Sequence, residues 1–146
     1  MTISEPAGQV IVADWSEHAD TLFAIRRQVF IVEQNVPEEL EHDQHDATAV
    51  HVLITDTDGR GIATGRLLPD GHIGRVAVLA EYRGSGIGRQ VMIALHQIAR
   101  ERGHTQIILN SQLSALPFYR RLGYRAEGPE FIEAGIRHRR MRLQLE

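Results

Sequence analysis

Three glycines separated by single residues lie in the segment RGSGIG of this 146-residue chain, directly after an apolar run and before a helical pattern. They are Gly84, Gly86 and Gly88. Backbone N–H groups at the start of a helix have no partner within the helix and carry the positive end of its dipole, so they can bind an anion. Glycine has no side chain to block a ligand from that backbone. Because Arg83 and Arg89 add charge that suits phosphate, the segment predicts a diphosphate-binding loop.

The same three glycines also fit a tight strand-to-helix turn in which they only relieve backbone strain. Their spacing excludes two nucleotide-binding folds. The pattern is G-x-G-x-G rather than the dinucleotide fingerprint G-x-G-x-x-G, and it lacks the lysine that a P-loop requires. Taken alone, the loop leaves the phosphate ligand and the simple turn as equal alternatives.

Composition limits the classes of protein to which the chain can belong. Its length suits one domain over residues 1–146, and 42 % hydrophobic and 24 % charged residues are ordinary for a globular protein. A net charge of −3 argues against nucleic-acid binding by bulk electrostatics. There is no cysteine, which excludes disulfides, thiolate nucleophiles and Cys-ligated zinc. Without a signal peptide or an apolar run of about 18 residues, the expectation is a cytoplasmic protein with no membrane partner.

The elements that position the loop follow from periodicity and turn residues. Apolar runs bounded by turn residues predict strands at Gln9–Ala13, Val50–Thr55, 61–68, 73–79, 105–109, from 124 onward and at 136–145. Apolar residues at three- and four-residue spacing predict helices at 17–32, 87–103 and 114–122.

The order of these elements predicts the fold class. Asp-Gly pairs between the early strands are typical of hairpins, so those strands should form an antiparallel meander. The strand, helix and strand around the glycine loop form a parallel β-α-β crossover. We therefore expect an α/β fold with a mixed sheet of six or seven strands and helices on both faces.

Two motifs resemble those of a known family. The segment from Arg83 to Gly88 resembles the pyrophosphate motif R/Q-x-x-G-x-G/A of the GNAT superfamily of N-acetyltransferases, and PFY (117–119) with LGY (122–124) resembles its later F-Y…L-G-F signature. Other segments of the chain resemble the small ElaA-type branch of this superfamily. They are RQVFIVEQ (27–34), the acidic stretch ending at Asp46 together with His51, FIE (131–133), and Ile136 with HRRM (138–141). The resemblance covers nearly the whole chain and implies a single GNAT domain.

The resemblance implies acetyl-CoA as the donor and a primary amine, of a small molecule or an exposed amino group, as the acceptor, with direct attack in a ternary complex. It places the diphosphate on the loop and the pantetheine arm along the preceding strand. A backbone N–H near Val78 would stabilise the oxyanion of the thioester carbonyl. Asn110 would bind the pantetheine arm or, alternatively, cap the next helix. The implied cofactor contacts are Val76, Ala77, Val78, Arg83, Gly84, Ser85, Gly86, Ile87, Gly88, Arg89, Asn110, Phe118 and Tyr119.

Acid and base catalysis need side chains that the motif only partly identifies. Tyr119 is implied as the acid that protonates the departing thiolate, and its alternative role is packing beneath the sheet. The protonated amine must lose a proton before it attacks, so a base or a chain of waters is also required. Glu33 and His51 are the catalytic candidates that we carry forward, and spacing does not separate them from Glu41, Asp43, Asp46, Glu133 and His138.

Several alternatives remain open at this level. The acidic run at 38–46 could attract a cationic amine or could be a solvated face. His42 and His45 lack a clear third ligand, so we expect no metal site. A non-catalytic acyl-CoA-binding module is the main alternative function, and nucleic-acid binding through Arg137, Arg139 and Arg140 is a weaker one. A homodimer is a common arrangement for domains of this size.

Overall fold

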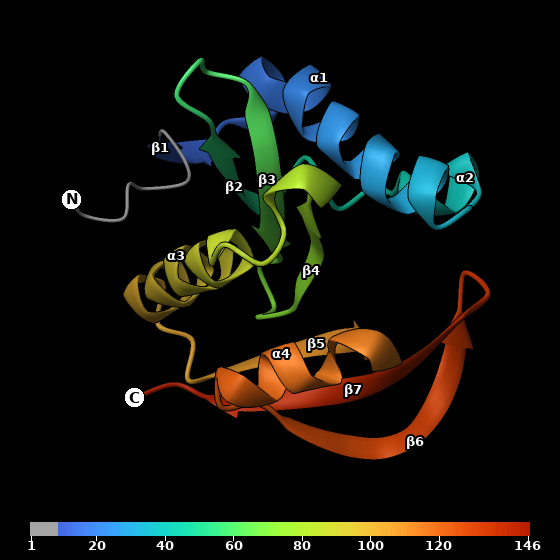
Figure 1. The fold of residues 1–146 in the computed structure, drawn as a ribbon. Helices are drawn as coiled ribbons and strands as arrows, with labels where there is room; N and C mark the ends of the chain where they lie inside the picture. The colour runs from blue at the N-terminus through green and yellow to red at the C-terminus, as the bar shows by residue number, and fades with distance from the viewer. Residues whose placement is uncertain (1–8) are drawn as a thin grey trace.

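In the computed structural model, which describes residues 9–146, seven strands form two antiparallel sheets (Figure 1). The first sheet has the order β1 (Gln9–Ala13), β2 (Val50–Thr55), β3 (Gly61–Leu67) and β4 (Ile73–Val78). The second has the order β5 (Gln106–Gln112), β7 (Ile136–Gln144) and β6 (Arg125–Glu133). The expected α/β fold with an antiparallel meander is therefore confirmed.

Helices cover both faces of the first sheet. On one face lies α1 (Trp15–Arg26), and on the other lies α3 (Ile87–Glu101). A Cβ added at Gly61 of β3 would meet Thr21 and Ile25 of α1, whereas one added at Gly65 would meet Val91 and Leu95 of α3. The sheet is thus packed so closely between the two helices that only glycine fits at both points.

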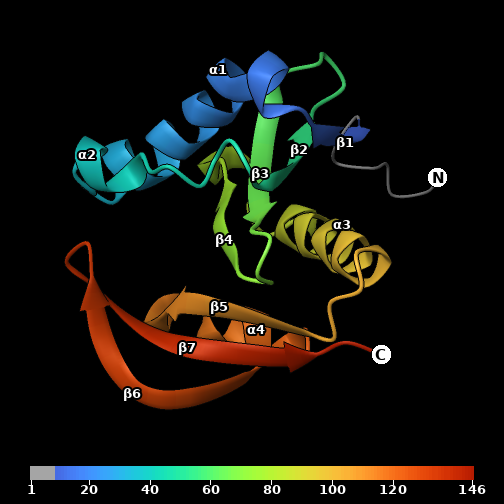
Figure 2. The same cartoon turned by 180° about the vertical axis from the view of Figure 1, so that it is seen from behind.

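The first helix differs from its expected span. The regular helix α1 ends at Arg26, and the chain continues as the π-helix η1 (Arg27–Glu33). The acidic run then begins with one short helix, α2 (Glu38–Glu41). Both views place α2 and the turn between β6 and β7 at the same end of the molecule (Figures 1 and 2).

The two sheets meet at the predicted parallel crossover, where one β-bridge joins the described strands of one sheet to those of the other. One parallel bridge joins His72, just before β4, to Ile108 of β5, and the amide of Ile108 donates to the carbonyl of Gly71 at 3.2 Å. Beyond this bridge β4 and β5 belong to separate sheets. We call the unpaired stretch between the two strands, on the side of the glycine loop, the opening between the sheets.

The second sheet carries α4 (Leu116–Arg121), preceded by the 3₁₀ turn η3 (Leu113–Ala115). A hydrogen bond joins α3 to the start of the second sheet: Nε2 of His96 in α3 lies 2.6 Å from the hydroxyl of Tyr124, which directly precedes β6. Both side chains are buried. Burial, with a smaller contribution from the charge of Arg100, lowers the pKa of His96 to about 4.

This shift makes native stability dependent on pH. The unfolded chain protonates His96 near its ordinary value of 6.5, while the folded chain resists protonation down to about 4. Stability should therefore be complete above pH 6.5 and fall as the pH drops towards 4, by about 2 to 3 kcal/mol. Urea unfolding at pH 7 and pH 4.5 measures this loss. His96→Gln can still pair with Tyr124 but does not titrate, so it should show a smaller loss; an unchanged loss would contradict the assignment.

Candidate functional site

The loop between β4 and α3 has the backbone conformation that its glycines predict. Gly84 and Gly86 have φ values of 82° and 88°, in the left-handed region that favours glycine. Gly86 is also the N-cap of α3, and a Cβ at either residue would meet nothing within 4 Å. The space above this part of the loop is therefore open. A valine at Gly86 would fill that space and would also strain the backbone. The variant therefore cannot distinguish a blocked ligand site from a distorted loop.

Gly88 has a different role from the other two glycines. A Cβ added there would lie 3.3 Å from Cζ of Phe118 and 3.7 Å from Val78. Its position allows the ring of Phe118 in α4 to pack against the first turn of α3. One glycine of the motif therefore serves packing, while two shape the open loop.

Arg83 does not extend freely towards a phosphate. Its Nη1 and Nη2 each donate to a carboxylate oxygen of Glu33 at 2.9 Å, and its Nε donates to the carbonyl of Val78 at 2.9 Å. Just beyond η1, the side-chain amide of Gln112 donates to that of Gln34 at 2.8 Å. The end of η1 is thus held against β4 on one side and against β5 on the other.

The edge of β4 that faces β5 offers unpaired backbone groups. The amide of Leu79 donates to the carbonyl of Ile62 at 2.9 Å, so this N–H points towards β3. Backbone directions alternate along a strand, and the N–H groups of Val76 and Val78 therefore point to the opposite edge. This edge faces the opening between the sheets, whereas the side chain of Ala77 is buried.

Tyr119 is part of the hydrophobic core. Its ring packs edge-on against Phe118 and Tyr124, with centroids 5.0 and 5.7 Å away, and only 9 % of the residue is exposed. Burial raises the pKa of Tyr119 to about 12. The hydroxyl therefore keeps its proton at neutral pH, as an acid must.

Two hollows contain candidate site residues. One, of about 610 Å³, lies between α1 and the residues after β4, with Glu33, Leu79 and Ala80 in its wall. The other, of about 460 Å³, lies on the second sheet and includes Asn110 and Phe131. Asn110 is an exposed residue within β5, so the alternative that it caps a helix is wrong.

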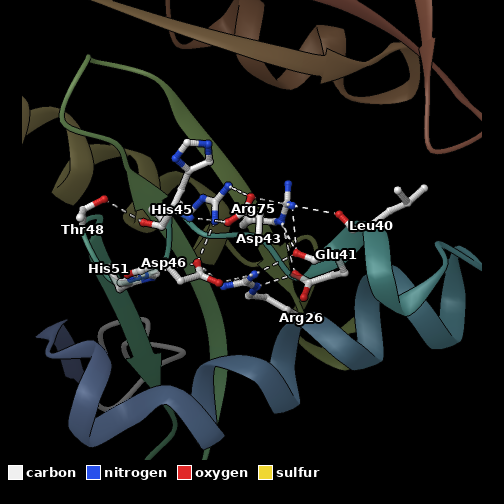
Figure 3. A network of polar contacts seen from close by, with 10 residues as sticks. Arg26, Leu40, Glu41, Asp43, His45, Asp46, Thr48, His51 and Arg75 are labelled. Atoms are coloured by element: carbon white, nitrogen blue, oxygen red, sulfur yellow. Dashed lines mark hydrogen bonds and ion pairs between the residues drawn. The ribbon is translucent and has the colours of Figure 1, made fainter.

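The acidic run is only partly solvated: Glu41 and Asp46 are buried in a network of polar contacts (Figure 3), whereas the other residues of 38–46 are exposed. Glu41 and Asp46 are 2 % and 3 % exposed, and both pair with the buried Arg26 of α1, at 2.6 and 2.9 Å. Arg66 of β3 pairs with Asp46 at 2.8 Å and with Asp43 at 2.6 Å. Three carboxylates and three arginines form this ion network, which is buried except for the partly exposed side chains of Asp43 and Arg75: Arg26, Glu41, Asp43, Asp46, Arg66 and Arg75.

The network keeps the carboxylates of Asp43 and Asp46 ionised. Burial alone raises the pKa of Asp46, but hydrogen bonds and charge from Arg26 and Arg66 outweigh it and hold the pKa below its usual value. The same balance, with Arg66 as the main partner, lowers the pKa of Asp43. Neither carboxylate lines the 610 Å³ hollow that includes Glu33, so neither is placed to accept a proton from a substrate there.

His51 belongs to this network rather than to the opening between the sheets. It is 1 % exposed, its ring stacks on Trp15, and its Nε2 lies 2.9 Å from the carbonyl of Asp46. Burial lowers the pKa of His51. The structure thus places a candidate base where a substrate amine has no access, which removes the physical reason for that role.

The remaining base candidates lie on the second sheet. His138 is buried, stacks on Phe131 and has Nδ1 2.7 Å from the carbonyl of Ile136. Glu133 is exposed at the end of β6. Of the candidates, Glu33 alone lines the hollow beside the end of β4.

Within residues 9–146, no helix is long and apolar enough to cross a membrane, and no group of three or more acidic or histidine side chains is arranged to hold a metal.

Sequence reasoning did not identify the arginines of the network. Arg26, Arg66 and Arg75 are far apart in the chain, and each is the one arginine of its helix or strand. The one available signal was the dense acidic run, because buried carboxylates require cationic partners.

Comparisons with known proteins agree with this architecture. The family model described as Acetyltransferase (GNAT) domain matches residues 9–145. The uncharacterized N-acetyltransferase YjcF of Bacillus subtilis is 36 % identical over 137 residues, which cover 91 % of this chain and 97 % of YjcF. A solved protein from Lactobacillus plantarum is 29 % identical with a TM-score of 0.87, over 94 % of this chain and 98 % of that one. The crystal structure of Escherichia coli ElaA is 27 % identical with a TM-score of 0.82, over 92 % and 98 %.

These matches extend over almost the whole described chain, and they include both the glycine loop and the strands that open beside it. The fold accordingly implies a coenzyme A derivative as cosubstrate, for which the exposed loop and the free edge of β4 offer a fitting surface. The chain belongs to the GNAT acetyltransferase family.

Proposed function

We propose that this protein transfers an acetyl group from acetyl-CoA to a primary amine, of a small molecule or an exposed amino group, by direct attack in a ternary complex. The observation that carries the proposal is the opening between β4 and β5. Unpaired N–H groups of Val76 and Val78 line it, and the open glycine loop lies at its end.

The chain binds the donor mainly through its backbone. N–H groups from Gly84 to Arg89 receive the diphosphate at the start of α3, where the helix dipole favours negative charge. Val76 pairs with the amides of the pantetheine arm as a neighbouring strand would. Asn110, on the facing strand β5, supplies a side-chain amide to the same arm.

Charge stabilisation and proton transfer fall to three groups. The N–H of Val78 stabilises the negative charge that develops on the thioester oxygen. Tyr119 donates a proton to the departing thiolate. Glu33 accepts the proton of the amine, directly or through a water, since its carboxylate lies in the wall of the 610 Å³ hollow. Hydrogen bonds from Arg83 fix the orientation of that carboxylate.

A panel of amines tests the proposal. The protein is mixed with acetyl-CoA and each amine, and the release of free thiol is followed. Release that depends on one class of amine supports the transferase. Tight coenzyme A binding without turnover of any amine would instead favour an acyl-CoA-binding module.

Arg89 tests the diphosphate-binding loop without straining the backbone. It is exposed in the first turn of α3, and its side chain adds a positive charge beside the loop. Arg89→Gln should weaken coenzyme A binding about fivefold to tenfold, because one charge-assisted hydrogen bond is lost. Isothermal titration calorimetry measures the affinity. Arg102→Gln, at the far end of the same helix, is the control and should leave it within about twofold; equal effects would indicate only a change in net charge.

A further inference from the structure

We propose that Arg75 is a positioning residue for the pantetheine arm: its side chain holds a strained bulge of β4 in the shape that turns Val76 and Val78 towards the cofactor. This inference rests on the proposed function, since it concerns the same opening. It assigns a role to a residue that neither the glycine motif nor the tyrosine motif includes.

The bulge is defined by the pairing of β3 with β4. Thr64 pairs with Ala77 and Arg66 pairs with Gly74, so Gly65 alone stands opposite both Arg75 and Val76. Two residues opposite one is the mark of a β-bulge, which bends a strand and increases its twist.

The bulge is strained. Arg75 has φ 53°, in the left-handed region, which a non-glycine residue adopts only at an energetic cost. The facing residue must also be small, because a Cβ added at Gly65 would lie 2.8 Å from Val91 and 3.3 Å from Val76. Something must therefore stabilise this conformation against regular pairing.

The guanidinium of Arg75 supplies that stabilisation. Its Nη2 donates to the carbonyl of Glu41 at 2.9 Å, to that of Leu40 at 3.3 Å and to Oδ2 of Asp43 at 3.1 Å, and its Nε donates to the carbonyl of Glu41 at 3.2 Å (Figure 3). The anchor is itself firm, since Glu41 is 2 % exposed and paired with Arg26. The side chain thus ties the bulge to the end of α2.

The location of the bulge connects it to the opening. The only bridge between the described parts of the two sheets ends at His72, and the free edge of β4 begins at Val76. Arg75 lies between the two, where β4 turns away from β5. Because N–H directions alternate, a shift of one residue here would turn Val76 and Val78 away from the opening.

The test compares two ligands in the full-length protein. Coenzyme A uses both the loop and the strand, whereas adenosine 3′-phosphate 5′-diphosphate lacks the pantetheine arm and uses only the loop. Arg75→Asn removes the guanidinium but tolerates the left-handed conformation. Calorimetry should show coenzyme A affinity reduced at least fivefold and nucleotide affinity within about twofold of the wild type.

Controls separate positioning from general destabilisation. Asp46→Asn weakens the same network away from the bulge, so it should lower Tm without changing the preference for coenzyme A over the nucleotide. Should Arg75→Asn fail to fold, Arg75→Lys is the second variant, because it keeps the charge but replaces the guanidinium with a single ammonium group. It should bind coenzyme A at least twofold more weakly than the wild type, with no change in nucleotide affinity. Equal loss for both ligands, or loss for neither, overturns the inference. If the wild type itself does not prefer coenzyme A to the nucleotide, the proposed function fails instead.

Discussion

Replacing Tyr119 with phenylalanine is expected to lower kcat for acetyl transfer about 100-fold, the lower range for losing a general acid. The dissociation constant of coenzyme A should stay within about twofold, because the ring that packs between Phe118 and Tyr124 is retained. Stopped assays of thiol release, with the panel amine that the wild type acetylates fastest, give kcat, and calorimetry gives the affinity.

The raised pKa sharpens this expectation. Because burial raises the pKa of Tyr119 to about 12, the wild type should show no loss of kcat from deprotonation of this residue between pH 7 and pH 10. Tyr82→Phe is the matched control, since the hydroxyl of Tyr82 donates to Asp56 in a partly exposed position away from α4. It should leave kcat unchanged. A Tyr119→Phe enzyme with normal kcat would show that the residue only packs.

Features that depend on neighbouring residues could be predicted from the sequence. The glycine loop, the helix that follows it and the hairpins are set by backbone freedom and periodicity within a few residues. Gly84 and Gly86 therefore have the conformation that the pattern predicts, and most strand bounds agree to within one or two residues. The motif around Tyr119 is local in the same sense.

Features that depend on distant partners could not be predicted. The sequence left open whether the acidic run attracts an amine or is solvated, and it did not predict an ion network, because Arg26, Arg66 and Arg75 are brought to the run only by the fold. Arg83 pairs with Glu33, 50 residues earlier, and this contact too exists only through the fold. His51 alternates with apolar residues in a strand, and that pattern does not say which helix covers it.

The π-helix η1 also depends on distant partners that the sequence does not reveal. Apolar spacing continues from α1 across residues 27–33, so periodicity predicts one regular helix. The wider turns carry Glu33 to Arg83 and Gln34 to Gln112. Arg83 follows β4 in the chain and Gln112 belongs to β5, so no local pattern encodes these two contacts.

The buried ion network leads to the largest expected loss of stability. Arg26 is 1 % exposed and donates to Glu41 Oε2, to both carboxylate oxygens of Asp46 and to the carbonyl of Glu41. Methionine fills a similar volume but offers no donor. Arg26→Met should therefore lower the free energy of unfolding by about 3 to 5 kcal/mol, because it leaves buried carboxylates without their partner. Chemical denaturation at pH 7 measures the loss.

The next residue along the chain is the matched control. Arg27 pairs with Glu38 at 2.9 Å, but both side chains are 58 % exposed. Such pairs contribute about 0 to 1 kcal/mol, so Arg27→Met should be nearly neutral. The effect of Arg26→Met should also shrink at low pH. The paired arginines hold the pKa of Asp46 below its usual value, so the stability that this pairing contributes is present above about pH 4 and lost as the pH falls further. If the two variants lose the same stability at pH 7, then the network contributes no more than a surface pair, and residues 38–46 are held by packing alone.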